Sequence, residues 1–252
     1  EAGIAWVEDP SNRDQRFERA RMRGCGDALA KLGLTPEALA RSARRLRRAR
    51  AALDHAADKF LAEQGAMSEA GYCLIARDAL VALPAEIALR VLARVVNAVG
   101  GRETPLRLAK LEALLASLIE NPKTTHTLGG CRLQPAGERL GIFRETRGTG
   151  LPTLRLAPGE RALWDNRFRV ELEASARTPV TVGALGETRW RELRATAPWL
   201  DALPRFAGAT LPACLAGGSI VLPRFGLGSD GGDEATVCFR ARFVNAPSTR
   251  RI

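Results

Sequence analysis

The sequence has few of the residues that commonly carry chemistry at an active site. Among its 252 residues there are two histidines and five cysteines, and aromatic residues make up 5%. The cysteines are odd in number, widely spaced and without a C-x-x-C pair, so a zinc site would need several distant residues to converge. We therefore expect no bound metal. We also expect the cysteines to be free, mostly buried thiols in a reducing compartment.

Long apolar segments are absent as well. A membrane-spanning helix needs about 20 predominantly apolar residues, and the longest candidate, residues 80–100, is interrupted by Glu86, Arg90 and Arg94. Residues 1–14 lack the basic start and apolar core of a signal peptide. We expect a cytoplasmic protein with no membrane partner. Because the first residue is Glu1 rather than Met, we expect this chain to be part of a longer one.

The charge is unbalanced towards basic residues. The 38 basic and 28 acidic side chains give a net charge of +10, and 34 of the basic residues are arginine. The 46% of hydrophobic residues is ordinary for a globular protein and excludes a wholly disordered chain. The basic surplus favours a polyanionic partner, with nucleic acid ahead of a membrane surface. The alternative is a soluble protein with an arginine-rich surface.

The hydrophobic pattern changes near residue 121. Before it, apolar residues recur at steps of three and four, which predicts helices over residues 35–65, 84–99 and 105–120. Thr35 and Pro36 are typical of a helix start. After residue 121, alternating apolar residues and turn signals predict strands. The predicted fold class is α+β, with an N-terminal helical domain followed by a strand-rich α+β domain.

The expected strands lie between turns rich in Gly and Pro. They occupy residues 124–133, 139–145, 163–173, 180–185 and 236–243. The first two are expected to form a hairpin through a turn at 135–138. A short helix is expected over 188–196, and the Gly and Pro residues of 146–158 mark a boundary within this half.

Arginines gather near the N-terminus and in the first long helix. A helix is predicted over residues 14–23, where Arg16, Arg19 and Arg23 fall on one face that can hold a phosphate backbone. The alternative is an exposed helix balanced by nearby acidic residues. The long helix carries further candidate backbone contacts at Arg41, Arg44, Arg45, Arg47, Arg48 and Arg50.

Five motifs occur in an order that resembles one enzyme family. They are E-D-P-S-N at 8–12 followed by Phe17 and R-x-R-x-R at 19–23; L-P-x-E-h-x-x-R-h-L-x-R-h-h at 83–96; T-L-G-G-C at 127–131; R-E at 144–145; and W-D-x-R-F-x-V at 164–170. Together they resemble the C-terminal region of the tRNA(Ile)-lysidine synthetase family and cover almost the whole chain. One departure is Ala20, where the family usually has Asn.

The resemblance implies a ligase that uses ATP to attach lysine to C2 of the wobble cytidine of tRNA(Ile) with a CAU anticodon. In that family the ATP-binding S-G-G-x-D-S loop lies N-terminal to the E-D-P-S-N motif, and no such loop occurs in this sequence. The implied cofactors, ATP and Mg²⁺, therefore belong to a full-length enzyme, and this chain is expected to hold no cofactor, no metal and no catalytic residue. The implied partners are the tRNA and L-lysine, and a homodimer is left open.

The resemblance also assigns regions and residues. Residues 1–23 are the end of a catalytic domain with its linker, 24–120 a helical tRNA-recognition domain, and 121–252 an α+β C-terminal tRNA-binding region with a subdivision near 146–158. The residues implied to lie near the active site are Glu8, Asp9, Ser11 and Asn12. The expected tRNA contacts are Arg19, Arg21, Arg23, Arg44, Arg45, Arg48, Arg132, Arg144, Arg167 and Arg169.

Two geometric expectations accompany these contacts. Arg44, Arg45 and Arg48 lie on more than one face of the long helix, so not all of them can reach the same RNA strand. Arg167 and Arg169 are two apart in one expected strand and so point the same way. The scarcity of aromatic residues favours recognition of phosphates and RNA shape over base stacking.

Two other functions remain open at this point. One is a non-catalytic RNA-binding module or a degenerate paralogue. The other is a scaffold that binds no RNA, whose interactions would not weaken steeply with salt as phosphate contacts do.

Overall fold

The structure is a computed structural model and describes residues 16–18, 21, 25–146, 150–195, 197–216, 219–223, 239–244 and 250–251. The chain divides into two compact units, Glu1–Ala52 and Leu53–Ile252. The division falls inside the long helix, whereas the sequence placed its main boundary at residues 120 and 121. Within the described part of the chain, no helix is long and apolar enough to cross a membrane.

The described residues of the first unit are mostly helical. They include α2, Gly26–Lys31, and the first part of α3, Pro36–Gln64. The helix α3 begins as predicted, because the Thr35 hydroxyl accepts a hydrogen bond from the backbone N–H of Ala38 at 3.2 Å. Its 29 residues make it about 44 Å long.

The last turns of α3 belong to the second unit and pack on α5, Ala85–Gly100. Arg94 donates to Asp58 Oδ1 at 2.5 Å and to Asp54 Oδ1 at 2.9 Å, which fixes the two helices side by side. The helix α5 ends at a left-handed residue, Gly101 at φ 62°. The neighbouring helices are α4, Arg77–Val81, and α6, Leu108–Glu120.

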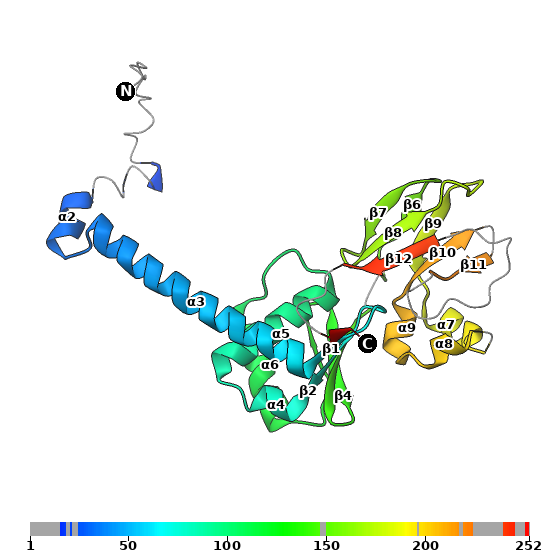
Figure 1. The fold of residues 1–252 in the computed structure, drawn as a ribbon, viewed down its shortest axis with the longest axis horizontal. Coiled ribbons are helices and arrows are strands. Elements are labelled where there is room, and N and C mark those ends of the chain that lie inside the picture. Colours follow the sequence, from blue (N-terminus) through cyan, green and yellow to red (C-terminus); the bar gives the residue numbers. More distant parts are fainter. Residues whose placement is uncertain are drawn as a thin grey trace, which may run out of the picture. The chain divides into compact units, whose positions relative to one another are not determined.

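Among the described residues, the largest sheet, sheet A, has the strand order β13-β1-β2-β5-β4-β3. Figure 1 labels three of its strands, β1, β2 and β4. Its strands are β1 Gly65–Met67, β2 Cys73–Ala76, β3 His126–Leu128, β4 Cys131–Ala136, β5 Arg139–Arg144 and β13 Arg250–Arg251. Sheet A therefore joins strands from both sides of residue 121. The predicted single strand over 124–133 is wrong, because Gly129 and Gly130 at φ 63° and 79° form the turn between β3 and β4.

Sheet A is buried on both faces because its residues alternate between two cores. Ile75 and Ile142 face the core that contains α5 and α6. Phe143, from the opposite face of β5, packs with Tyr72 and with the helices α7, Glu187–Leu193, α8, Pro198–Asp201, and α9, Arg205–Ala209. The α+β fold class is confirmed.

Two smaller sheets complete the described part of the second unit. Sheet B has the order β11-β10-β9-β6, and sheet C has the order β12-β8-β7. Their strands are β6 Leu154–Leu156, β7 Arg161–Trp164, β8 Phe168–Leu172, β9 Val180–Ala184, β10 Pro212–Ala216, β11 Ser219–Val221 and β12 Phe239–Phe243. The predicted strand over 163–173 is wrong as a single element. Asp165 and Asn166, at φ 50° and 51°, form a turn that separates β7 from β8.

Candidate nucleic-acid interface

The first part of α3 carries a dense group of exposed arginines at positions 41, 44, 45, 47, 48 and 50. Arg44 and Arg48 lie one turn apart on the same side of the helix, and Arg45 is rotated by about 100° from Arg44. Arg44 and Arg48 therefore share a side of the helix from which they can reach the same RNA strand, while Arg45 faces elsewhere, as expected. Among the described residues, none of these three has an ion-pair partner.

Most of the predicted contacts near the N-terminus lie outside the described residues: Glu8, Asp9, Ser11, Asn12, Arg19 and Arg23. Arg21 is described and exposed. Its Nη1 donates to the backbone oxygen of Arg16 at 3.0 Å. The roles assigned to these residues stay predictions.

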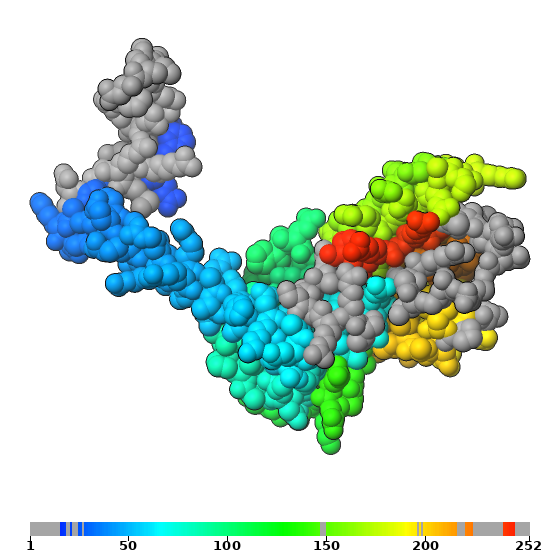
Figure 2. Space-filling view, viewed as in Figure 1, coloured from blue at the N-terminus to red at the C-terminus, as the bar shows by residue number. Residues whose placement is uncertain are grey.

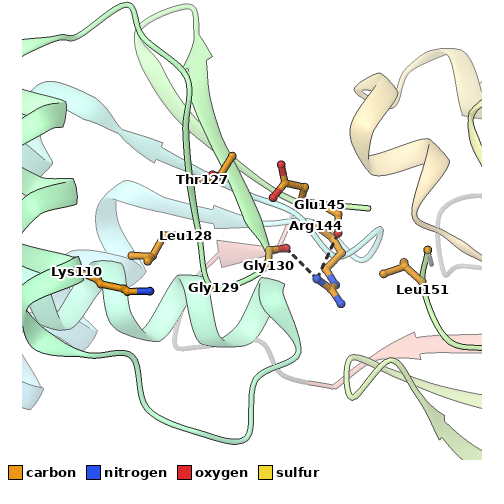
Figure 3. Close-up of a pocket in the computed structure, with 9 residues that line it drawn as sticks. Lys110, Thr127, Leu128, Gly129, Gly130, Arg144, Glu145 and Leu151 are labelled. Atoms are coloured by element: carbon orange, nitrogen blue, oxygen red, sulfur yellow. Dashed lines mark hydrogen bonds between the residues drawn. The ribbon is translucent and has the colours of Figure 1, made fainter. Parts of the chain in front are cut away.

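Three of the sequence motifs meet at one point in the second unit, here called the arginine junction: Gly130, Arg144, Asp165 and Arg167. Arg144 donates from Nε and Nη2 to the two carboxylate oxygens of Asp165, at 3.0 and 2.9 Å. Its Nη1 donates to the backbone oxygen of Gly130 at 3.0 Å (Figure 3). The side chains of Arg144 and Asp165 are 16% and 5% exposed, so the pair is largely withdrawn from water.

Arg167 is the most buried member of the arginine junction, with 0% of its side chain exposed. Its Nε donates to Asp165 at 2.6 Å and its Nη2 to the backbone oxygen of Thr210 at 3.1 Å. Burial lowers the pKa of Arg167 to about 10, against the opposing effect of Asp165. A fully buried guanidinium does not reach an RNA phosphate in this conformation.

The expectation that Arg167 and Arg169 point the same way is therefore wrong. Arg167 lies in the turn after Asp165 and Asn166 and points inward, whereas Arg169 lies on β8 and is exposed. The signal for this turn was available, because an Asp-Asn pair between alternating residues favours a hairpin with positive φ angles. The arrangement holds the β7–β8 turn against the end of sheet A.

The T-L-G-G-C motif forms a tight, half-buried turn that ends at the buried Cys131. At Gly130 a Cβ atom would lie 2.5 Å from Arg144 Nη1, and at Gly129 it would lie 2.8 Å from Val96 Cγ1. The Cys131 thiol donates to the backbone oxygen of Val96 at 3.3 Å, and burial raises its pKa to about 12. The motif therefore packs the turn on α5 and supplies no reactive thiolate.

A cleft of about 330 Å³ opens beside the arginine junction (Figure 3). Its described lining residues are Lys110, Thr127, Leu128, Gly129, Gly130, Arg144, Glu145, Gly150 and Leu151. Among them there is no histidine or cysteine, and Arg144 is already held by Asp165 and Gly130. The lining therefore lacks the imidazole and thiol groups that commonly serve as base and nucleophile.

The two remaining predicted contacts have different environments. Arg132 is half-buried, donates to Gln134 Oε1 at 2.9 Å and stacks over Phe206 with its Cζ 4.5 Å from the ring centroid. Arg169 is exposed and lies opposite Arg242 of β12. Sequence reasoning missed Arg242, since the pairing of β8 with β12 brings together residues far apart in the chain.

The described residues contain no group of three or more His, Cys, Asp or Glu that could hold a metal ion. Cys73, Cys131 and Cys214 are free and buried, as predicted, while Cys25 is free but exposed. Cys238 lies outside the described residues.

Comparison with known proteins gives a consistent set of relatives, although no family model matches the chain. The chain is 39% identical over 168 residues to a tRNA(Ile)-lysidine synthase of Ruegeria pomeroyi, a match that covers 66% of this chain and 38% of that protein. It is 43% identical over 152 residues to the tRNA(Ile)-lysidine synthase of Methylobacterium nodulans, covering 57% and 44%. The one from Wolbachia pipientis is 27% identical over 187 residues, covering 74% and 43%. The chain thus spans less than half the length of these curated relatives.

Proposed function

Since this chain belongs to the tRNA(Ile)-lysidine synthase family, we propose that it is the C-terminal, tRNA-recognising part of an ATP-dependent ligase. The ligase converts the wobble cytidine of tRNA(Ile) with a CAU anticodon to lysidine, with L-lysine as the second substrate. In this proposal the chain contributes tRNA binding and no catalytic residue.

The observation that carries the proposal is the group of exposed arginines on α3. Arg44, Arg45 and Arg48 have no ion-pair partner within the described part of the chain, so their charge is available to an external anion. Arginines that neutralise phosphates release condensed counterions, and this release supplies much of the affinity for nucleic acid. The net charge of +10 acts in the same direction.

We assign ATP and Mg²⁺ to a part of the enzyme other than this chain. The sequence has no S-G-G-x-D-S loop, and its described residues offer no cluster of metal-binding side chains. The residues at hand therefore do not fit a nucleotide–magnesium site, and no step of the ligase reaction is assigned to them.

The proposal is tested by binding of the chain to unmodified tRNA(Ile) with a CAU anticodon, compared with tRNA(Met), which has the same anticodon, over a series of salt concentrations. We expect tight binding that weakens with salt and prefers tRNA(Ile). Salt-sensitive binding without preference would favour a non-catalytic RNA-binding module. Absence of binding would refute tRNA recognition by this chain and favour a scaffold.

The contribution of α3 is tested with the double substitution Arg44→Ala and Arg48→Ala. Alanine preserves the helix because it has the highest helix propensity. We expect the plot of log affinity against log salt concentration to lose about one to two units of slope. The double substitution Arg44→Lys and Arg48→Lys is the matched control, which keeps the charge and should keep the slope. An unchanged slope in the alanine variant would remove this side of α3 from the interface.

A further inference from the structure

One face of sheet C is open to solvent and is lined by charged side chains. In β7, β8 and β12 the residues alternate, so that Val170, Phe239 and Phe243 are buried on the inner face. The outer face carries Arg161, Leu163, Arg169, Glu171, Arg240 and Arg242. Figure 2 shows β12, in red, at the molecular surface.

Two of the four arginines on this outer face are neutralised by the chain itself. Arg161 donates to Glu171 at 2.9 Å, and Arg240 donates to Glu173 at 2.8 Å. The hydrogen bond from Arg161 lowers the pKa of Glu171, as expected for a carboxylate beside a guanidinium. These pairs satisfy the charges at one end of the outer face.

The other two arginines, Arg169 and Arg242, are placed against each other. They are directly opposite in the β8–β12 register, and both are exposed. Among the described residues, neither has an ion-pair partner. On its other side Arg169 is opposite Leu163 of β7, so no acidic side chain faces it across either strand pair. Like charges directly opposite in a sheet are destabilising, and the described residues supply no carboxylate paired with either arginine.

We propose that Arg169 and Arg242 form a two-arginine clamp that holds a backbone phosphate of RNA on the outer face of sheet C. The inference rests on the proposed tRNA-binding function and adds to it a second surface, distinct from α3. Side chains directly opposite in an antiparallel pair have Cβ atoms about 4.5–5.5 Å apart, so both guanidinium groups can converge on one phosphate. Each guanidinium can donate two parallel hydrogen bonds to phosphate oxygens.

The shape of the face favours a polymer over a free anion. The clamp lies on an open sheet surface with exposed side chains, so a single ion would remain largely hydrated there. A nucleic acid strand brings successive phosphates, and contacts elsewhere on a basic chain hold it in place. The occupant we assign is therefore RNA, with free phosphate and an acidic polypeptide as the occupants that the test must exclude.

The outer face provides its own matched control. The double substitution Arg169→Ala and Arg242→Ala removes two positive charges from the clamp. The double substitution Arg161→Ala and Arg240→Ala removes two positive charges from the same face, but these arginines are already paired with carboxylates. A general loss of charge would affect both variants equally, whereas a phosphate clamp would affect only the first.

The experiment measures binding of the whole 252-residue chain and both variants to tRNA over about 50–200 mM salt. Loss of one phosphate contact should reduce the slope of log affinity against log salt by about 0.9, which is about eightfold in affinity at 0.1 M salt. We expect this loss in the clamp variant and less than a twofold change in the control. Equal losses in the two variants, or no loss in the clamp variant, would overturn the proposal.

Further measurements separate the clamp from a structural role and from other occupants. Because the substitution relieves repulsion, the thermal midpoint of the clamp variant should equal or exceed that of the original chain, and a lower midpoint would count against the clamp. The variant Arg169→Lys with Arg242→Lys keeps the charges, so it should retain the salt slope. It should still bind RNA more weakly, because lysine lacks the planar guanidinium that donates two parallel hydrogen bonds. Titration with inorganic phosphate or poly-L-glutamate should show no dependence on the clamp, and an equal dependence would overturn the assignment to RNA.

The clamp and the proposed function can fail separately. If the chain binds tRNA(Ile) and tRNA(Met) equally but the clamp variant loses slope, the clamp stands and recognition of tRNA(Ile) by this chain fails. If the chain prefers tRNA(Ile) and the clamp variant keeps its slope, the clamp fails and the proposed function stands. If the chain binds no RNA, both are refuted.

Discussion

Asp165 neutralises two arginines that are themselves withdrawn from water. It accepts two hydrogen bonds from Arg144 and one from Arg167, whose side chain is fully buried. The substitution Asp165→Asn removes the charge but keeps the size of the side chain. Asn also tolerates the φ of 50° at this position, so the turn between β7 and β8 should be preserved.

The magnitude follows from the burial of the arginine junction. Removing one partner of a buried ion pair typically costs about 3–5 kcal/mol, because the remaining charge is left uncompensated. In a domain of about 150–250 residues, 1 kcal/mol shifts the thermal midpoint by about 2–4 °C. The second unit, Leu53–Ile252, is in this size range. Asp165→Asn should therefore lower the midpoint of the second unit by about 6–20 °C.

The assay is thermal unfolding followed by calorimetry, with Asp201→Asn as the control. Asp201 also pairs with an arginine, Arg194, but the two side chains are 61% and 45% exposed. Exposed pairs contribute little, so the control should shift the midpoint by less than about 2 °C. A similar small shift for Asp165→Asn would refute the conclusion that the arginine junction holds the sheets together.

Four further predictions concern the turn at Gly130, the thiols and the start of α3. Gly130→Ala places a Cβ 2.5 Å from Arg144 Nη1 at a φ of 79°, and we expect the free energy of unfolding in urea to fall by about 1–3 kcal/mol. Iodoacetamide at pH 8 should label Cys25 and leave Cys131 unlabelled in the native chain, as peptide mapping would show. Burial raises the pKa of the Cys131 thiol from 9.0 to about 12 in the folded chain, so the unfolded chain loses this proton first as the pH rises. The contribution of this thiol to the free energy of unfolding is therefore full below pH 9 and is lost as the pH rises towards 12, and Cys131→Ala should reduce that decline. Thr35→Ala should destabilise the first turn of α3 by about 1 kcal/mol, detectable as faster amide exchange there.

The helices were predictable because their signals are local. Thr35 caps α3 through the hydrogen bond expected of an N-cap residue, and Gly101 ends α5 in the left-handed conformation that glycine favours. The exposed arginines of α3 were predictable for the same reason. Helical periodicity alone decides which of them share a side of the helix.

The strands and their contacts were less predictable because pairing depends on residues distant in sequence. Nothing near Gly65 indicates that β1 pairs with β2 on one side and β13 on the other. The junction between Arg144 and Asp165, and the opposition of Arg169 and Arg242, follow from strand registers that one sequence does not reveal. Composition therefore showed that arginines were abundant, but it did not separate those that hold the sheets together from those that face solvent.

The position of β1 in sheet A has a consequence for the time course of synthesis. Its neighbour β2 follows within a few residues, but its other neighbour, β13, comes near position 250. Roughly 180 residues separate β1 from β13. Synthesis at about 5–20 residues per second therefore leaves one edge of β1 unpaired for about 10–40 s on the ribosome. An unpaired edge invites pairing with other chains, and natural proteins blunt it by keeping it short. With only three residues, β1 offers a nascent neighbour few hydrogen bonds during that interval.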